Sequence, residues 1–175
     1  GGYRREPGSG GDFDNYQEFL ISRIADVVRI AINNLEPAQI GWGGGNAPEH
    51  VFVRRYKMKP GTPMPNPFGG QDKVVMNPGH SPNVIDHSGK NDPEVAFISV
   101  KSIEGKPIAL LANYSLHYVG YVPQGHISAD YFAVFADRIQ ELLKADRQEP
   151  PFVGIMSNGT SGNINNINYL KPRIT

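Results

Sequence analysis

The sequence predicts an α/β protein in which a layered, mixed β-sheet is covered by helices. Two segments have apolar residues at helical spacing, and several short apolar segments are typical of strands. In the second half of the chain the order is strand, loop, helix and strand, as expected for a layered sheet. The chain has 175 residues, of which 39% are hydrophobic, so it can bury one ordinary core. We therefore expect residues 1–175 to form a single domain or a piece of a larger one.

The composition excludes several classes of protein. Lys plus Arg and Asp plus Glu both number 17, so the formal net charge is zero and no cationic surface for nucleic acid is expected. The absence of cysteine excludes a disulfide framework, a thiolate nucleophile and a cysteine-bound metal site. No apolar run approaches the roughly 20 residues of a membrane-spanning helix. The 20 glycines and 15 prolines predict long, shaped loops.

The first predicted helix covers residues 15–34. Asp14 and Gln17 have the spacing of a capping box, and apolar side chains recur at helical spacing behind them. Pro37 ends this segment, because proline cannot continue a helix. Residues 38–42 then predict a short strand that stops at the three glycines 43–45.

The middle of the chain predicts strands separated by a long irregular connection. Residues 50–58 indicate one strand, whereas residues 59–92 are rich in Pro, Gly and Asn, and a connection of that length is usually functional or disordered. Glu94–Ser102 and Pro107–Tyr114 flank a tight connection and predict a β-hairpin. The second arm is apolar on both faces, which predicts a central strand covered on both sides.

The last part of the chain predicts a parallel crossover. Ser128 is expected to cap a helix over residues 129–145 that carries an apolar stripe, and residues 152–156 predict another buried strand. A right-handed crossover would make this strand a parallel neighbour of the second hairpin arm. The loops after both strands would then open at the same edge of the sheet, which is where sites form in such folds.

His117, which follows the hairpin, is the best candidate for a metal ligand. Imidazole is the commonest nitrogen ligand, and the end of a strand would fix it while leaving one side open. A loop histidine that is only hydrogen bonded would fit the same position. Asp130 could orient a ligand or a water, although the helix dipole explains a carboxylate near a helix N-terminus equally well.

Two further groups of polar residues are candidates for substrate contacts. Arg54 and Arg55 lie in a segment flanked by apolar residues, where an arginine guanidinium could hold a carbonyl or an anionic group, whereas a surface ion pair is expected for at least one of the two. The loop that begins at Ser157 and Asn158 is rich in Asn, Ser and Gly, whose side chains and amides can form an oxyanion site. It contains no G-x-S-x-G motif, so a nucleophile-elbow hydrolase is not expected.

The order of these segments resembles the catalytic domain of the neutral/alkaline non-lysosomal ceramidase family. That family's D-P-E-V strand pair and its strand ending in F-x-x-H are similar to NDPEVAFISVKSIEGKPIALLANYSLHYVG (91–120). Its I-S-x-D segment and helix resemble HISADYFAVFADRIQ (126–140), and its S-N-x-G-D-V-S-P-N loop resembles IMSNGTSGNINNINY (155–169). Its N-R segment looks like VRRY (53–56), and its T-H-x-H-S-G-P motif is expected just before GGYRRE (1–6). The resemblance spans nearly the whole chain.

The resemblance implies a zinc site. The family is a zinc-dependent amidohydrolase whose ligands are two His, a Glu and a Tyr, and His117 matches the second His. The first His is expected upstream of Gly1, and the Glu and the Tyr downstream of Thr175. Residues 1–175 would therefore hold an incomplete zinc site.

The resemblance also implies roles for the other candidates. Arg54 would bind the substrate or polarise its carbonyl, and Ser157, Asn158 and Asp130 would contact the substrate. The family's reacting serine aligns with Asn163, whose amide is not nucleophilic. Asn163 would instead donate to an oxyanion or orient a metal-bound water.

On this resemblance the chain is part of a larger catalytic domain that uses zinc to hydrolyse the amide bond of a ceramide-like or other N-acyl lipid. The expected partner is therefore a small lipid amide. The expected location is extracellular or periplasmic, as for relatives of this kind, although residues 1–175 show no signal peptide. The alternative is a non-catalytic domain of the same fold whose loops bind lipid head groups or glycans.

Overall fold

The computed structural model describes residues 13–118, 120 and 122–172, which fall into two units, Gly1–Pro37 and Ala38–Thr175. The first unit contains helix α1 (Asn15–Asn33), which confirms the first predicted helix. Its capping box is formed, because the Gln17 N–H donates to Asp14 Oδ1 at 2.8 Å and the Asp14 N–H donates to Gln17 Oε1 at 3.1 Å. Segment 1–6, to which the family comparison extends, lies outside the described residues.

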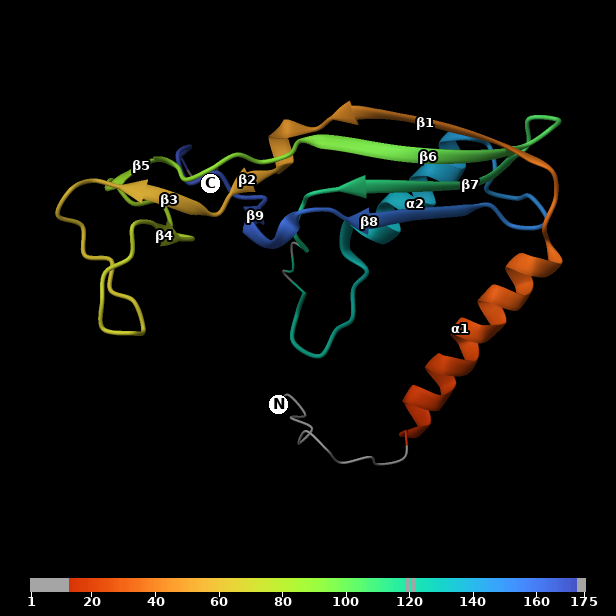
Figure 1. The fold of residues 1–175 in the computed structure, drawn as a ribbon, viewed down its shortest axis with the longest axis horizontal. Helices are drawn as coiled ribbons and strands as arrows, with labels where there is room; N and C mark the ends of the chain where they lie inside the picture. Colours follow the sequence, from red (N-terminus) through yellow and green to blue (C-terminus); the bar gives the residue numbers. More distant parts are fainter. Residues whose placement is uncertain (1–12, 119, 121, 173–175) are drawn as a thin grey trace. The chain divides into compact units, whose positions relative to one another are not determined.

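The second unit is built on a four-stranded sheet with the strand order β1-β6-β7-β8 (Figure 1). Its strands are β1 (Ala38–Asn46), β6 (Glu94–Ser102), β7 (Pro107–Tyr114) and β8 (Val153–Asn158). Strand β6 is antiparallel to both β1 and β7, whereas β7 and β8 are parallel and are connected through helix α2 (Asp130–Leu142). The structure confirms the mixed α/β fold, the hairpin and the parallel crossover.

Two smaller sheets complete this unit. Strand β2 (Phe52–Val53) pairs antiparallel with β9 (Ile164–Asn165), and a three-stranded sheet has the order β4-β3-β5. Its strands are β3 (Arg55–Met58), β4 (Val75–Met76) and β5 (Val84–His87). The short 3-10 helices η1 (Pro48–His50) and η2 (Ser161–Asn163) precede β2 and β9. Figure 1 shows β2 and β9 between the two larger sheets.

The single strand predicted over residues 50–58 is wrong, because the segment divides at Arg54. Residues before Arg54 pair with β9, whereas residues after it pair with β4 and β5. The Arg54 N–H donates to the Asn163 carbonyl at 2.9 Å, and the Arg54 carbonyl accepts from the Asn77 N–H at 2.7 Å. Both backbone groups of Arg54 are thus satisfied at the point where the chain changes from one sheet to the other. The connection 59–92, predicted to be irregular, contains β4 and β5.

Strand β1 continues through the glycines at which the sequence predicted its end. Gly43 is paired with Phe97 and Gly45 with Val95, so the ladder with β6 holds this backbone extended. A side chain at position 43 would displace the Phe97 ring, because an added Cβ would lie 2.9 Å from Phe97 Cζ. Pairing with a neighbouring strand therefore outweighs the low strand propensity of glycine.

Helix α2 packs on one face of the sheet and contacts β8. Its N-cap is Ala129 and not the predicted Ser128, whose Oγ accepts from the N–H of the first helical residue at 3.0 Å. The helix ends at Leu142, earlier than predicted. Gly154 allows this close packing, because an added Cβ would lie 2.7 Å from Ile139 Cγ2.

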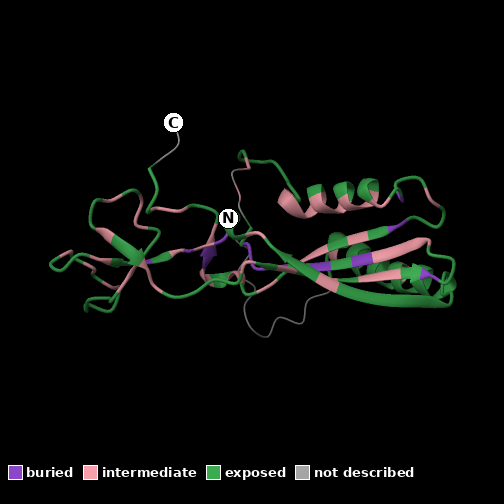
Figure 2. Ribbon diagram, turned by 90° about the horizontal axis from the view of Figure 1, so that it is seen from above, coloured by how far each residue is buried: buried purple, intermediate pink, exposed green. Residues whose placement is uncertain are grey.

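The buried residues form two clusters that share strand β7 (Figure 2). The edge cluster consists of Val51, Val53, Tyr114, Leu116 and Ile164, and the helix cluster consists of Leu110, Ala112, Ala145 and Phe152. Strand β7 is central, as predicted. The sequence also predicted that both faces of this strand are covered. Leu111 and Ile155, on the face opposite α2, are 45% and 48% exposed, so within the described part of this unit only the face that carries α2 is covered. The apolar side of α2 that packs on the sheet is also narrower than predicted, because Val134 and Leu142 are 67% and 62% exposed.

Candidate functional site

Strands β7 and β8 end side by side, and the residues there form what we call the polar edge: Asn113, His117, Ser157 and Asn158. The parallel register aligns Asn113 with Ser157 and Tyr114 with Asn158. Asn113 Nδ2 donates to Ser157 Oγ at 2.9 Å, and Ser157 Oγ donates to the Ala112 carbonyl at 3.0 Å. His117 lies three residues beyond the end of β7 and is exposed. The structure thus brings His117, Ser157 and Asn158 to one edge, as the parallel crossover requires.

Tyr131, in the first turn of α2, links the two loops of the polar edge. Its hydroxyl donates to the Leu116 carbonyl at 2.7 Å and also lies 3.3 Å from Asn158 Oδ1. Burial, followed by the nearby Asp130 and Tyr114, raises the pKa of Tyr131 to about 12. Its hydroxyl is therefore protonated at neutral pH and acts as a donor. The sequence analysis did not identify Tyr131, because an aromatic residue in a predicted helix gives no signal of a polar contact.

Asp130 anchors the loop that leads from β7 to α2. Its Oδ2 accepts from the Gly120 N–H at 3.1 Å, and its Oδ1 accepts from the Tyr131 N–H at 2.6 Å. The residue adopts the left-handed conformation with φ of 53°, which is uncommon for a residue other than glycine. These contacts hold the start of α2, and a role for Asp130 in substrate binding stays a prediction.

The loop after β8 folds back onto the loop after β7 at Gly159. The Gly159 N–H donates to the Tyr114 carbonyl at 2.8 Å. An added Cβ at Gly159 would lie 2.8 Å from Asn113 Oδ1 and 3.0 Å from Ser115 Oγ, so this approach requires glycine. Ser115 and Thr160, the residues that follow Tyr114 and Gly159, also join the two loops, because Ser115 Oγ and Thr160 Oγ1 are 3.3 Å apart.

Asn163 is contacted by two consecutive arginines. Its carbonyl accepts from the Arg54 N–H at 2.9 Å, and its Oδ1 accepts from Arg55 Nη1. Of the two arginines considered in the sequence analysis, Arg55 is the one whose side chain reaches Asn163, although the substrate role was assigned to Arg54. Arg54 Nε is buried and has no hydrogen-bond partner within residues 13–118, 120 and 122–172. The catalytic roles predicted for Arg54 and Asn163 remain predictions.

The edge cluster connects these residues with the polar edge. Arg54 follows Val53, Asn163 precedes Ile164, and His117 follows Leu116, and all three apolar neighbours belong to this cluster. Tyr131 packs against the same cluster. The structure thus places three sequence-predicted site residues around one buried core, although they come from segments far apart in the chain.

The described residues do not by themselves provide a metal centre. Among residues 13–118, 120 and 122–172, no group of three or more His, Asp or Glu side chains could hold a metal ion. A structural zinc site has four ligands and a catalytic site three from the protein. His117 can supply one imidazole, so the described part of the chain does not fit a complete zinc site.

Comparison with known proteins shows a fold related to ceramidases. No protein-family model and no curated protein sequence matches the chain. The neutral ceramidase from Pseudomonas aeruginosa matches with a TM-score of 0.61 and 16% identity, over 94% of this chain and 23% of that chain. A ceramidase complexed with C2 matches with a TM-score of 0.55 and 16% identity, over 86% and 21%. The chain therefore has the fold of part of a ceramidase and spans less than a quarter of the length of either structure.

In the part of the chain that the structure describes, no helix is both long enough and apolar enough to cross a membrane.

Proposed function

We propose that the chain is part of a ceramidase-like hydrolase that cleaves the amide bond of a ceramide or another N-acyl lipid. The observation that carries this proposal is that His117, Arg54 and Asn163 each adjoin a member of the edge cluster, in a fold like that of part of neutral ceramidase. Residues held around one rigid core can keep the fixed geometry that catalysis needs.

Two side-chain amides supply hydrogen-bond donors to the proposed site. Asn163 Oδ1 accepts from Arg55 Nη1, and Asn158 Oδ1 lies 3.3 Å from the Tyr131 hydroxyl. Because Arg55 donates to Asn163 Oδ1, Nδ2 of Asn163 can donate to a substrate. The single proton of the Tyr131 hydroxyl is donated to the Leu116 carbonyl, so the 3.3 Å contact places the Asn158 amide beside this hydroxyl without fixing its orientation. A donor held in place stabilises the negative charge that develops on a carbonyl oxygen during amide hydrolysis. We assign this role to Asn163 and assign substrate binding to Asn158 and Ser157.

The guanidinium of Arg54 is proposed to bind the substrate carbonyl. Its Nε, which lacks a hydrogen-bond partner within the described residues, is a donor available for such a contact after a small movement. Asn163 is not a nucleophile at neutral pH, so attack by water and no acyl-enzyme is expected.

His117 is proposed as one ligand of a zinc ion. Zinc in a hydrolase site lowers the pKa of a bound water and polarises a carbonyl. A single imidazole does not complete such a site, so the other ligands would have to come from parts of the protein other than the described residues.

The test is hydrolysis of a ceramide with a fluorescent acyl chain, measured with the longest protein that the gene encodes and together with its zinc content. We expect release of the fluorescent fatty acid, and loss of both zinc and activity in His117→Ala. Asn163→Ala should keep its zinc and lower turnover by roughly 10²- to 10³-fold, the loss typical of one oxyanion donor. The matched control is Asn166→Ala, an exposed asparagine whose replacement should leave turnover unchanged.

Two results would overturn parts of this proposal. An acyl group trapped on Ser161 or Thr160 would show covalent catalysis and contradict the role of Asn163. A protein that holds zinc but cleaves no amide would instead favour a non-catalytic domain that binds lipid head groups or glycans. Asparagine at the position of the family's serine is the observation that supports this second candidate.

We also propose that the protein acts outside the cytoplasm. The family resemblance supports an extracellular or periplasmic location. Fractionation of cells that express the full gene would test it, and recovery of the protein from the cytoplasm alone would refute it.

A further inference from the structure

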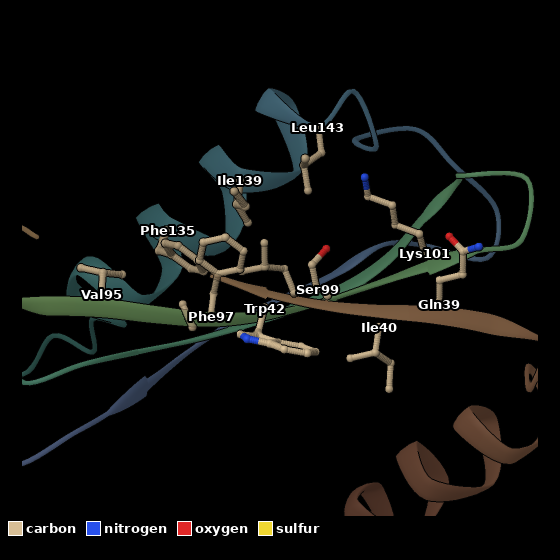
Figure 3. A pocket seen from close by; sticks show the side chains of 13 residues that line it. Gln39, Ile40, Trp42, Val95, Phe97, Ser99, Lys101, Phe135, Ile139 and Leu143 are labelled. Carbon is tan, nitrogen blue, oxygen red and sulfur yellow. The ribbon is translucent and has the colours of Figure 1, made fainter. Parts of the chain in front are cut away.

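A groove of about 570 Å³ lies between helix α2 and the part of the sheet formed by β1 and β6 (Figure 3). Its walls are largely apolar and include Phe97, Leu110, Phe135, Ile139 and Leu143. A volume of this size falls within the range of roughly 300–1,000 Å³ that is usual for small-molecule sites. None of the residues to which we assign a role in hydrolysis lines this groove.

Strand β1 presents bare backbone to the groove at Gly41. Gly41 lines the groove, and an added Cβ there would meet no atom within 4 Å. Gly43 lies on the same face of β1, since side chains alternate along a strand, but there the ring of Phe97 covers the backbone. Glycine inside a strand often marks a place where a ligand approaches the backbone closely.

The polar side chains of the groove gather at one end. Lys101 is paired with Gln39 and Ser99 with Gly41, whereas Val95 lines the opposite end. Figure 3 shows Lys101 and Ser99 on the same side of the sheet as the helix. Lys101 has no ion-pair partner among the described residues. The groove therefore combines a long apolar wall with one unpaired ammonium group at its end.

We propose that this groove binds one long-chain carboxylate, with its alkyl chain along β6 and its carboxylate at Lys101. The charge supports this choice, because a single anion at the end of an apolar chain complements a single cation at the end of an apolar groove. The length supports it too. At about 3.3 Å per residue, Val95 to Lys101 spans roughly 20 Å, which an extended chain of roughly 16 carbons also spans.

This inference is independent of the proposed hydrolysis. In the hairpin register, Val95 is paired with Tyr114 near the polar edge, whereas Lys101 is paired with Pro107 at the other end of β7. The carboxylate would therefore be held at the edge of the sheet opposite to His117. A protein that cleaves no amide could still bind the carboxylate, and the reverse also holds.

Binding of hexadecanoate to the chain, measured by isothermal titration calorimetry below its micellar concentration, tests the proposal. We expect one molecule per chain, and a Kd for octanoate at least tenfold weaker, because the shorter alkyl chain buries less apolar surface. Lys101→Gln should weaken hexadecanoate binding by about three- to tenfold and leave hexadecanol binding unchanged. Lys90→Gln, at an exposed lysine outside the groove, is the charge-matched control.

A second pair of variants tests the groove itself. Gly41→Val should weaken hexadecanoate binding at least tenfold, because its side chain would project into the groove, where its Cβ would meet no atom within 4 Å. Gly45→Val, on the same strand and face but not lining the groove, should bind normally. The proposal is overturned if Gly41→Val binds as well as Gly45→Val, or if Lys101→Gln weakens hexadecanoate and hexadecanol equally. It is also overturned if hexadecanoate does not bind; dissociation of a dimer by Gly41→Val would then show that a second copy fills the groove.

Discussion

Replacement of Tyr131 by phenylalanine isolates the hydroxyl group that links the two loops of the polar edge. Phenylalanine keeps the ring, which packs on the edge cluster and stacks on Phe132 with ring centroids 4.2 Å apart. What is lost is the hydrogen bond to the Leu116 carbonyl at 2.7 Å. Leu116 is only 7% exposed, so its carbonyl would lose its donor in a place that water reaches poorly. Loss of one partner from a buried pair costs about 1–3 kcal/mol.

We expect Tyr131→Phe to lower the free energy of unfolding by about 1–2 kcal/mol, toward the lower end of this range because the loop can partly relax. Urea denaturation followed by circular dichroism measures the change. Tyr118→Phe is the matched control, since Tyr118 is 45% exposed and its replacement should alter stability by less than about 0.5 kcal/mol. If both variants unfold at the same urea concentration, the hydroxyl does not bridge the loops, and our account of the polar edge fails.

Three other predictions follow from the same region. Gly159→Ala should destabilise the chain by about 1–3 kcal/mol through the close approach of the two loops, whereas Gly162→Ala, whose Cβ would meet no atom within 4 Å, should be nearly neutral in the same urea experiment. Because folding raises the pKa of Tyr131 from 10.0 to about 12, this tyrosine stabilises the fold fully below pH 10 and loses that contribution as the pH rises to 12. The stability difference between the wild type and Tyr131→Phe should therefore shrink over this interval, and a constant difference would contradict the shift. Arg55→Gln should lower amide turnover with little further loss in the double variant with Asn163→Ala, because Arg55 acts by holding Asn163; additive losses in kcat would refute this coupling.

Local sequence patterns determined the elements whose contacts lie close together in the chain. The hairpin of Glu94–Ser102 and Pro107–Tyr114 was predicted with its observed bounds, because a short connection brings its two arms together. The start of α1 was predicted from Asp14 and Gln17, whose capping contacts span three residues. The parallel pairing of β7 and β8 also followed from sequence, because the handedness of crossovers leaves few alternatives.

Tertiary structure alone decided the features that depend on distant partners. Arg55 reaches Asn163 across 108 positions of the chain, and no local pattern distinguishes it from Arg54. The glycines of β1 are extended because β6 pairs with them, and at Gly41 this extended strand presents bare backbone to the groove. Propensity and periodicity reflect the preferences of each segment by itself. Strand pairing, buried hydrogen bonds and close backbone approaches depend instead on the distant segment that packs against it. For this reason the sequence indicated the edge at which the site lies, and only the fold showed which side chains meet there.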